Sequence, residues 1–98
     1  MPVTAILDLK LKADALADAN EIMHATLEGT RAFPGCLSVT VLVDQADPTH
    51  VAVYEQWESP EADAAYRQWR TTKEGASDLG TVLAAPPALT LFTIAEGV

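Results

Sequence analysis

The stretch that decides the fold is residues 51–70, VAVYEQWESPEADAAYRQWR. Side chains of two kinds alternate along residues 51–57, and this period of two indicates a strand with two different faces. Ser59 then offers an N-cap oxygen, and Pro60 suits the first turn of a helix, where no N–H donor is needed. The pattern therefore predicts a strand that passes directly into a helix at about Pro60.

The predicted helix carries its apolar groups on one face. Four residues recur there at helical spacing, namely Ala62, Ala65, Tyr66 and Trp69. Asp63 and Arg67 form an i,i+4 pair, which we place on the opposite face. We expect Trp57, at the end of the strand, to line the same interior as Tyr66.

The rest of the chain supplies three more strands and another helix. Alternating patterns predict strands at residues 3–11, 37–43 and 88–95, and a helical arc spans residues 14–33, with Asp14 as N-cap and Pro34-Gly35 as the stop. A turn is expected at residues 44–50 and a short helix within residues 71–87. This order is that of an α+β, ferredoxin-like βαββαβ sandwich, and residues 1–98 are expected to form one domain.

Both faces of the predicted sheet carry apolar side chains. If the helices cover the face of Val53 and Trp57, the opposite face presents Ile6, Leu42, Tyr54, Phe92 and Ile94. A soluble monomer rarely leaves such a contiguous apolar surface in water, and a two-fold dimer would cover it. We therefore expect a homodimer that is joined through its sheets.

The composition argues against several classes of partner. The net charge is −8 and the chain has only six Lys and Arg residues, so neither nucleic acid nor an anionic membrane surface is expected to bind. The first residues lack the features of a signal peptide, and no apolar stretch is long enough to span a membrane, so we expect a cytoplasmic protein. There is no closely spaced His/Cys cluster and no glycine-rich phosphate loop, and no metal or nucleotide is expected.

Two segments, FPGCLSVTVLVD and VYEQWESPEADAAYRQW, are followed by a Pro-rich break and TLFTIAEG. Together they resemble the antibiotic biosynthesis monooxygenase family of the dimeric α/β-barrel superfamily. The resemblance implies a ferredoxin-like subunit, a dimer whose two sheets form a barrel, and a pocket between each sheet and its own helices. It also implies the oxidation of a quinol, an anthrone or a similar polyketide-like aromatic by molecular oxygen, without a metal or flavin cofactor.

The family's functional residues match this chain at one position. Its catalytic Trp corresponds to Trp57, whereas its Asn falls on Val53 and its Tyr on Asp63. Many members carry a His where this chain has Tyr66. Haem-degrading relatives use a His on the second helical region, and because no His follows His50, haem degradation is not expected.

The residues that are present limit the chemistry. Cofactor-free oxygenation needs a base that forms an electron-rich anion in an apolar pocket. Four residues are candidates for catalysis: Trp57, Tyr66, His24 and Glu55. The two aromatic residues could orient a flat phenol, although core packing explains them equally well. Glu55 is predicted on the helix side of the sheet, so it must reach water, pair with a base or stay protonated.

A second set of residues is predicted to bind substrate: Val53, Asn20, Arg31 and Trp69. Asn20 and Arg31 share one flank of the first helix with His24, which we interpret as a pocket rim, and Trp69 also fits a packing role. The expected ligands are a small aromatic molecule and O2. Two alternatives stay open: a non-catalytic dimer that binds a small molecule, and a non-oxidative isomerase or cyclase that uses the same pocket.

Overall fold

The computed structural model describes all 98 residues. Its strands and helices follow the predicted order: β1 (Val3–Lys10), α1 (Leu16–Ala32), β2 (Cys36–Asp44), β3 (Asp47–Trp57), α2 (Pro60–Arg70) and β4 (Ala88–Phe92). Short 3₁₀ helices at Ala13–Ala15 and Leu79–Val82 complete the set, the second inside the segment where a short helix was expected. The predicted α+β, ferredoxin-like fold is confirmed. Neither helix is long and apolar enough to cross a membrane.

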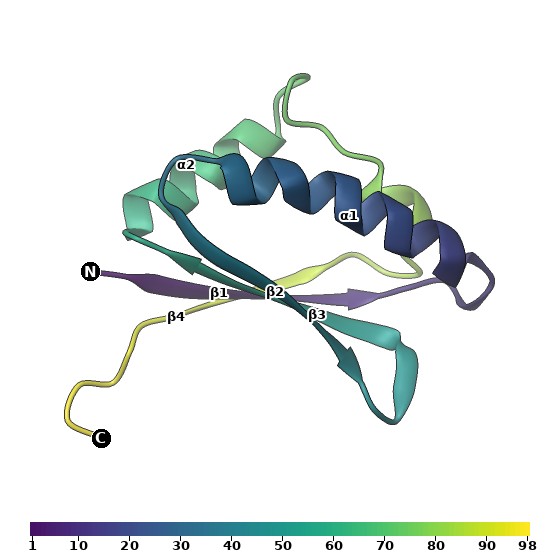
Figure 1. Cartoon of the computed structure of the whole chain (residues 1–98), viewed down its shortest axis with the longest axis horizontal. Coiled ribbons are helices and arrows are strands. Elements are labelled where there is room, and N and C mark those ends of the chain that lie inside the picture. The colour runs from purple at the N-terminus through teal and green to yellow at the C-terminus, as the bar shows by residue number, and fades with distance from the viewer.

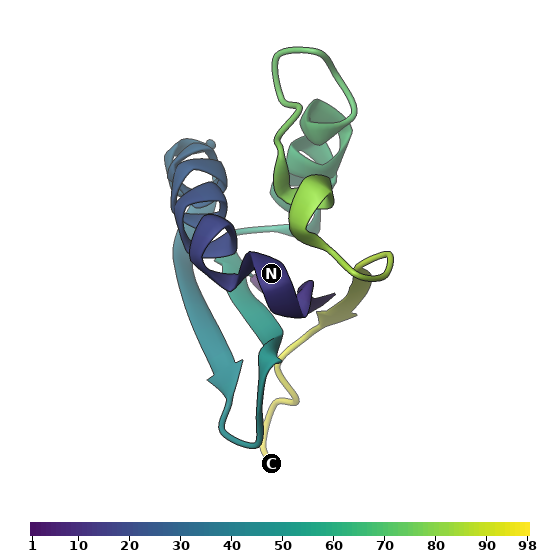
Figure 2. The same ribbon diagram turned by 90° about the vertical axis from the view of Figure 1, so that its right-hand side faces the viewer.

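The four strands form one antiparallel sheet in the order β2-β3-β1-β4. The central pair, β1 and β3, places Leu7 opposite Val53 and Val3 opposite Trp57. Both helices and the segment with the short helix at Leu79–Val82 lie on one face of this sheet, as Figures 1 and 2 show. The sheet therefore has an inner face, which the helices cover, and an outer face, which they leave open.

Two local features fix the position where α2 begins. Ser59 caps the helix as predicted, because its Oγ accepts a hydrogen bond from the Ala62 N–H at 3.1 Å. The turn between α1 and β2 contains Gly35, whose φ of 91° lies in the left-handed region. A Cβ at Gly35 would lie 2.5 Å from the Ala62 Cβ, so this turn packs tightly against the start of α2.

Three predicted boundaries differ from the structure. The helix α1 begins at Leu16 rather than Asp14, because a 3₁₀ turn precedes it and no side chain caps it. The turn before β3 is shorter than expected, since Asp44 pairs with Asp47. Pro48 fits in β3 because it lies at a register shift, where no ladder partner needs its missing N–H. The strand β4 ends at Phe92 because its partner there, Thr4, is already near the start of β1.

The core lies between the inner face and the helices, in two clusters. The larger contains Leu9, Leu11, Ala19, Met23, Leu27, Val51, Val53 and Val82. The smaller joins Val3, Ala5, Trp57 and Tyr66, with the Trp57 and Tyr66 rings 4.8 Å apart, so these two aromatics do share one interior.

The outer face is only partly apolar. Ile6 and Tyr54 are half-buried, whereas Leu42, Phe92 and Ile94 are exposed. Polar side chains such as Thr40 and Gln56 also belong to this face, because they pair beside Tyr54 and Thr4 in the ladder.

Candidate active site

A cavity of about 200 Å³ lies between the inner face of the sheet and both helices. Its apolar lining comes from Leu7, Leu9 and Val53 on the sheet, Met23 and Leu27 on α1, and Leu79. Its polar lining includes Glu55, Tyr66, Arg67 and Arg70, with Thr26 and Ser77 nearby. An apolar chamber with a few convergent polar groups is the usual form of a small-molecule site.

Glu55 is the polar group that projects from the sheet. Strand alternation turns it to the inner face, where it is 1% exposed. Arg67 Nη2 donates a hydrogen bond to Glu55 Oε1 at 2.6 Å, and Trp57 Nε1 donates to the same oxygen at 3.1 Å. The sequence left three states open for Glu55, namely contact with water, pairing with a basic residue and protonation. The structure shows pairing with a basic residue, Arg67.

The second carboxylate oxygen of Glu55, Oε2, has no hydrogen-bond partner in the chain. Both hydrogen bonds end on Oε1, and Oε2 accepts none from the chain. Glu55 lines the cavity, whereas Trp57 is completely buried and does not. Trp57 therefore holds the carboxylate in place rather than offering its ring face to a ligand.

Arg67 lies between two carboxylates. Its Nη2 also donates to Asp63 Oδ1 at 2.9 Å, and its Nε is buried without a hydrogen-bond partner. Asp63 is 3% exposed. The prediction that Asp63 and Arg67 pair is confirmed, but their predicted place on the outer side of the helix is wrong, because the buried charge of Glu55 draws Arg67 inward.

Tyr66 belongs to a chain of hydrogen bonds that joins α2 to α1. Arg70 Nε donates to the Tyr66 hydroxyl at 2.8 Å, and that hydroxyl lies 2.6 Å from Thr30 Oγ1. Arg70 Nη2 also donates to the carbonyl of Thr26 at 2.7 Å, and Nη1 donates to the carbonyl of Gly75 at 3.0 Å. Arg70 is thus fully engaged and fixes one wall of the cavity.

Five of the eight predicted site residues do not line the cavity: Trp57, described above, Trp69 and three residues of α1. His24 has a side chain that is 75% exposed and lies 3.3 Å from Glu28. Asn20 is exposed, and Arg31 donates to the carbonyl of Val39 at 3.2 Å. None of the three lines the cavity. Trp69 lies beside it, against Gly29. Val53, Glu55 and Tyr66 are the predicted residues that the structure does bring together.

Sequence reasoning missed Arg67 and Arg70 as lining residues. The signal was present, because Asp63, Tyr66, Arg67 and Arg70 recur at i, i+3, i+4 and i+7 and must share one face of a helix. A buried Glu55 on the strand before that helix needs a basic partner from this face.

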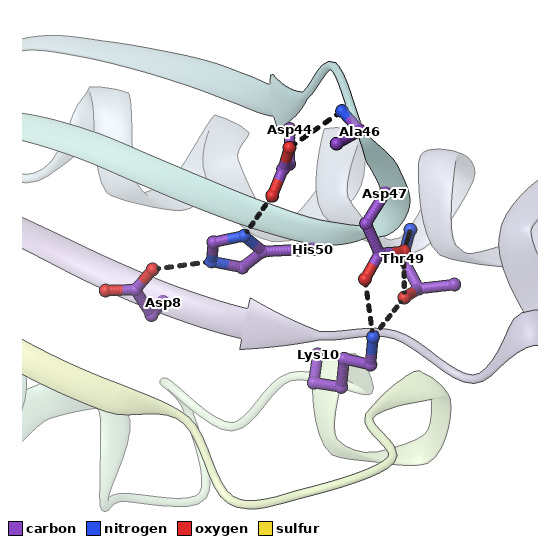
Figure 3. A network of polar contacts seen from close by, with 7 residues as sticks. All are labelled: Asp8, Lys10, Asp44, Ala46, Asp47, Thr49 and His50. Atoms are coloured by element: carbon purple, nitrogen blue, oxygen red, sulfur yellow. Dashed lines mark hydrogen bonds and ion pairs between the residues drawn. The ribbon is translucent and has the colours of Figure 1, made fainter.

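A second polar network lies on the outer face, at the tip of the β2–β3 hairpin (Figure 3). His50 Nδ1 lies 2.9 Å from Asp44 Oδ2, and Nε2 lies 2.9 Å from Asp8 Oδ1. Hydrogen bonds that His50 donates to Asp44 and to Asp8 raise the pKa of His50 above its usual value, and the bond to Asp44 lowers the pKa of that carboxyl. Lys10 similarly lowers the pKa of the neighbouring Asp47. No group of three or more His, Cys, Asp or Glu side chains is arranged to hold a metal ion.

Comparisons with known proteins agree with this architecture. The model of the family described as antibiotic biosynthesis monooxygenase matches residues 2–75, a range that includes every polar side chain of the cavity named above except Ser77. No curated protein matches the sequence.

Solved structures share the fold at low sequence identity. Rv0793 from Mycobacterium tuberculosis is 22% identical over 100% of both chains, with a TM-score of 0.79. SnoaB, a cofactor-independent oxygenase from Streptomyces nogalater, is 17% identical, with a TM-score of 0.80 over 99% of this chain and 96% of its own. The structural likeness extends past residue 75 to the last strand.

Proposed function

Because the chain belongs to the antibiotic biosynthesis monooxygenase family, we propose that it is a cofactor-independent monooxygenase that oxidises a quinol, an anthrone or a similar polyketide-like aromatic with O2. The observation that carries the proposal is that Glu55 lines a largely apolar cavity while both of its hydrogen bonds end on Oε1. The similarity to SnoaB, whose name describes a cofactor-independent oxygenase, supports the same reaction class.

In this proposal Glu55 Oε2 is the general base. For an anthrone it removes a proton from the reacting CH2 group, and the resulting carbanion transfers one electron to O2. The two radicals combine into a C–O bond, the peroxide takes up the proton, and loss of water leaves a carbonyl. The substrate carbon supplies four electrons; one oxygen atom enters the product and the other leaves as water.

The neighbouring groups position the base and stabilise the anion. Trp57 and Arg67 hold Oε1, which leaves Oε2 as the oxygen that can take the proton. The guanidinium groups of Arg67 and Arg70 lie 4.9 and 5.1 Å from the centre of the Tyr66 ring, and their charge favours a phenolate or carbanion nearby. The Nε of Arg67, which is buried without a hydrogen-bond partner, is a further charged donor beside the Glu55 carboxylate. Tyr66 orders this wall through Thr30 and Arg70.

Oxygen uptake tests the proposal. Purified, chelator-treated protein is given a panel of anthrones and naphthohydroquinones, and uptake is compared with enzyme-free autoxidation. We expect Glu55→Gln to lower the catalysed rate about 100-fold or more, since a positioned general base contributes at least that much. His24→Gln should leave the rate unchanged, because His24 is exposed and lies outside the cavity.

Other outcomes identify the alternatives. Equal losses in the two variants would contradict the role of Glu55. No uptake, combined with quenching of Trp fluorescence by the same compounds, would favour a non-catalytic binding protein or a non-oxidative isomerase or cyclase.

We further propose that the chain acts as a single domain and as a homodimer, with a second copy covering the outer face. The exposed Leu42 and Phe92 on that face support this assembly. Light scattering coupled to gel filtration should give a mass near twice the 10.4 kDa of one chain. A mass of one chain at micromolar concentration would contradict it.

A further inference from the structure

A second hollow of about 410 Å³ adjoins the cavity, and we name it the outer groove. It lies between one row of α1 (Glu21, Ala25 and Gly29), the end of α2 (Trp69 and Arg70) and residues 76–78. The three α1 residues are spaced by four, so they line one side of the groove along the helix.

The outer groove and the cavity share Thr26, Arg70 and Ser77 as lining residues. These three residues therefore form the boundary at which the two hollows adjoin. Ligand pockets usually measure about 300–1,000 Å³. The cavity alone, at about 200 Å³, is below that range. A polycyclic ligand whose reacting ring lies in the cavity must extend beyond it, and the outer groove is the adjoining space.

The walls of the outer groove are fixed by the fold. Arg70 ties α2 to the Thr26 carbonyl of α1 and to the Gly75 carbonyl of the following segment. A Cβ at Gly75 would lie 2.0 Å from the Trp69 carbonyl oxygen, so this segment packs directly on the end of α2. The groove is accordingly a preformed feature.

The charges at the groove select one kind of substituent. Glu21 and Asp78 are exposed carboxylates on opposite sides, one on α1 and one beside Ser77. Carboxylates accept hydrogen bonds and repel anions. The hydrogen bonds of Arg70 go to Tyr66, Thr30, Thr26 and Gly75 rather than to a ligand in the groove.

We infer that the outer groove is a second subsite for a polycyclic phenol whose reacting ring lies beside Glu55. The groove binds a substituent of that phenol that donates hydrogen bonds, namely a hydroxyl or an amine. This inference rests on the proposed function for the ring in the cavity. It adds the substrate's size and the chemistry of its distal end.

Binding without turnover tests the subsite. Two probes are titrated anaerobically and followed by quenching of Trp fluorescence: 1,4-naphthohydroquinone, which has two rings, and an anthrone that carries a hydroxymethyl group. Ala25→Phe fills the groove from an exposed position on α1. Ala17→Phe is the matched control, since Ala17 is also exposed on α1 but lines neither hollow.

We expect Ala25→Phe to weaken binding of the anthrone about tenfold, which corresponds to about 1.4 kcal/mol. The Kd of the naphthohydroquinone should change less than about twofold, and Ala17→Phe should change neither. In the wild type, a carboxylate in place of the hydroxymethyl group should weaken binding, and Glu21→Gln should reduce that difference.

The outcomes separate the two claims. If the wild type binds both probes and Ala25→Phe affects them equally or not at all, the subsite is overturned while the proposed function stands. If the wild type binds neither probe, both are overturned.

Discussion

Two cations in this molecule each lie between two carboxylates, one inside and one on the surface. Arg67 bridges Glu55 and Asp63 under the helices, and His50 bridges Asp44 and Asp8 on the outer face. The side chains of the inner carboxylates are 1% and 4% exposed, whereas those of the outer ones are 36% and 46% exposed. The same arrangement of charges therefore has different consequences in the two places.

Burial and the identity of the cation explain the difference. A guanidinium stays charged at every working pH, and removing it from buried carboxylates leaves their charges uncompensated. An imidazole donates through both ring nitrogens only when it is protonated, so the outer network is complete only with a charged His50. The inner network is a permanent part of the core, and the outer one depends on pH.

The largest effect is expected from Arg67→Met. It strips two buried carboxylates of their shared partner, and breaking a buried pair in this way costs about 3–5 kcal/mol of the free energy of unfolding. Urea unfolding followed by far-UV circular dichroism measures the change.

Arg31→Met is the matched control, because Arg31 is exposed and contacts only a backbone carbonyl. We expect a change of about 0.5 kcal/mol or less for it. Similar losses in the two variants would show that burial of the carboxylates does not decide the energy.

A smaller effect is expected from His50→Gln, and it should depend on pH. The pKa of His50 is raised in the folded state, so its contribution is fully present below about pH 6.5 and is lost as pH rises through the folded value. The pKa of Asp44 is lowered, so its contribution is present above about pH 3.8 and is lost as pH falls through the folded value. The difference in urea midpoint between the wild type and the variant should be largest between about pH 4 and 6.5, with the wild type the more stable.

The measurement compares the urea midpoints of the two proteins at pH 5.5 and pH 9. The gap between them should narrow at the higher pH, because only the wild type loses a proton at this position. A gap that stays constant would mean that the double hydrogen bond of His50 does not form in solution.

Much of the fold follows from local patterns in the chain. The alternation at residues 51–57 and the Ser59-Pro60 start of α2 predicted the central junction, because both signals depend on neighbours within one element. The start of β3 was harder to predict from the sequence, since Pro48 lies at a register shift that only the pairing with β2 reveals.

The candidate site was predicted only in part. Glu55 and Tyr66 were identified from their faces, but the inward turn of Arg67 follows from the position of Glu55 on a different element. His24 was favoured by its chemistry and by its flank of the first helix, and its side chain on that flank is exposed. A cavity is what remains after several elements have packed, so its boundary at Ser77 and Leu79, outside both helices, has no local signature.

The order of the strands in the sheet also determines how much conformational entropy the chain loses when each pair of strands forms. The hairpin of β2 and β3 closes a very short loop, whereas β1 pairs Val3 with Trp57, in the middle of the chain, and Thr4 with Phe92, near its other end. The cost of closing a loop rises with its length. The hairpin is therefore the part of the sheet whose closure costs the least entropy, and the pairs that β1 makes with β3 and β4 cost more because they close longer loops.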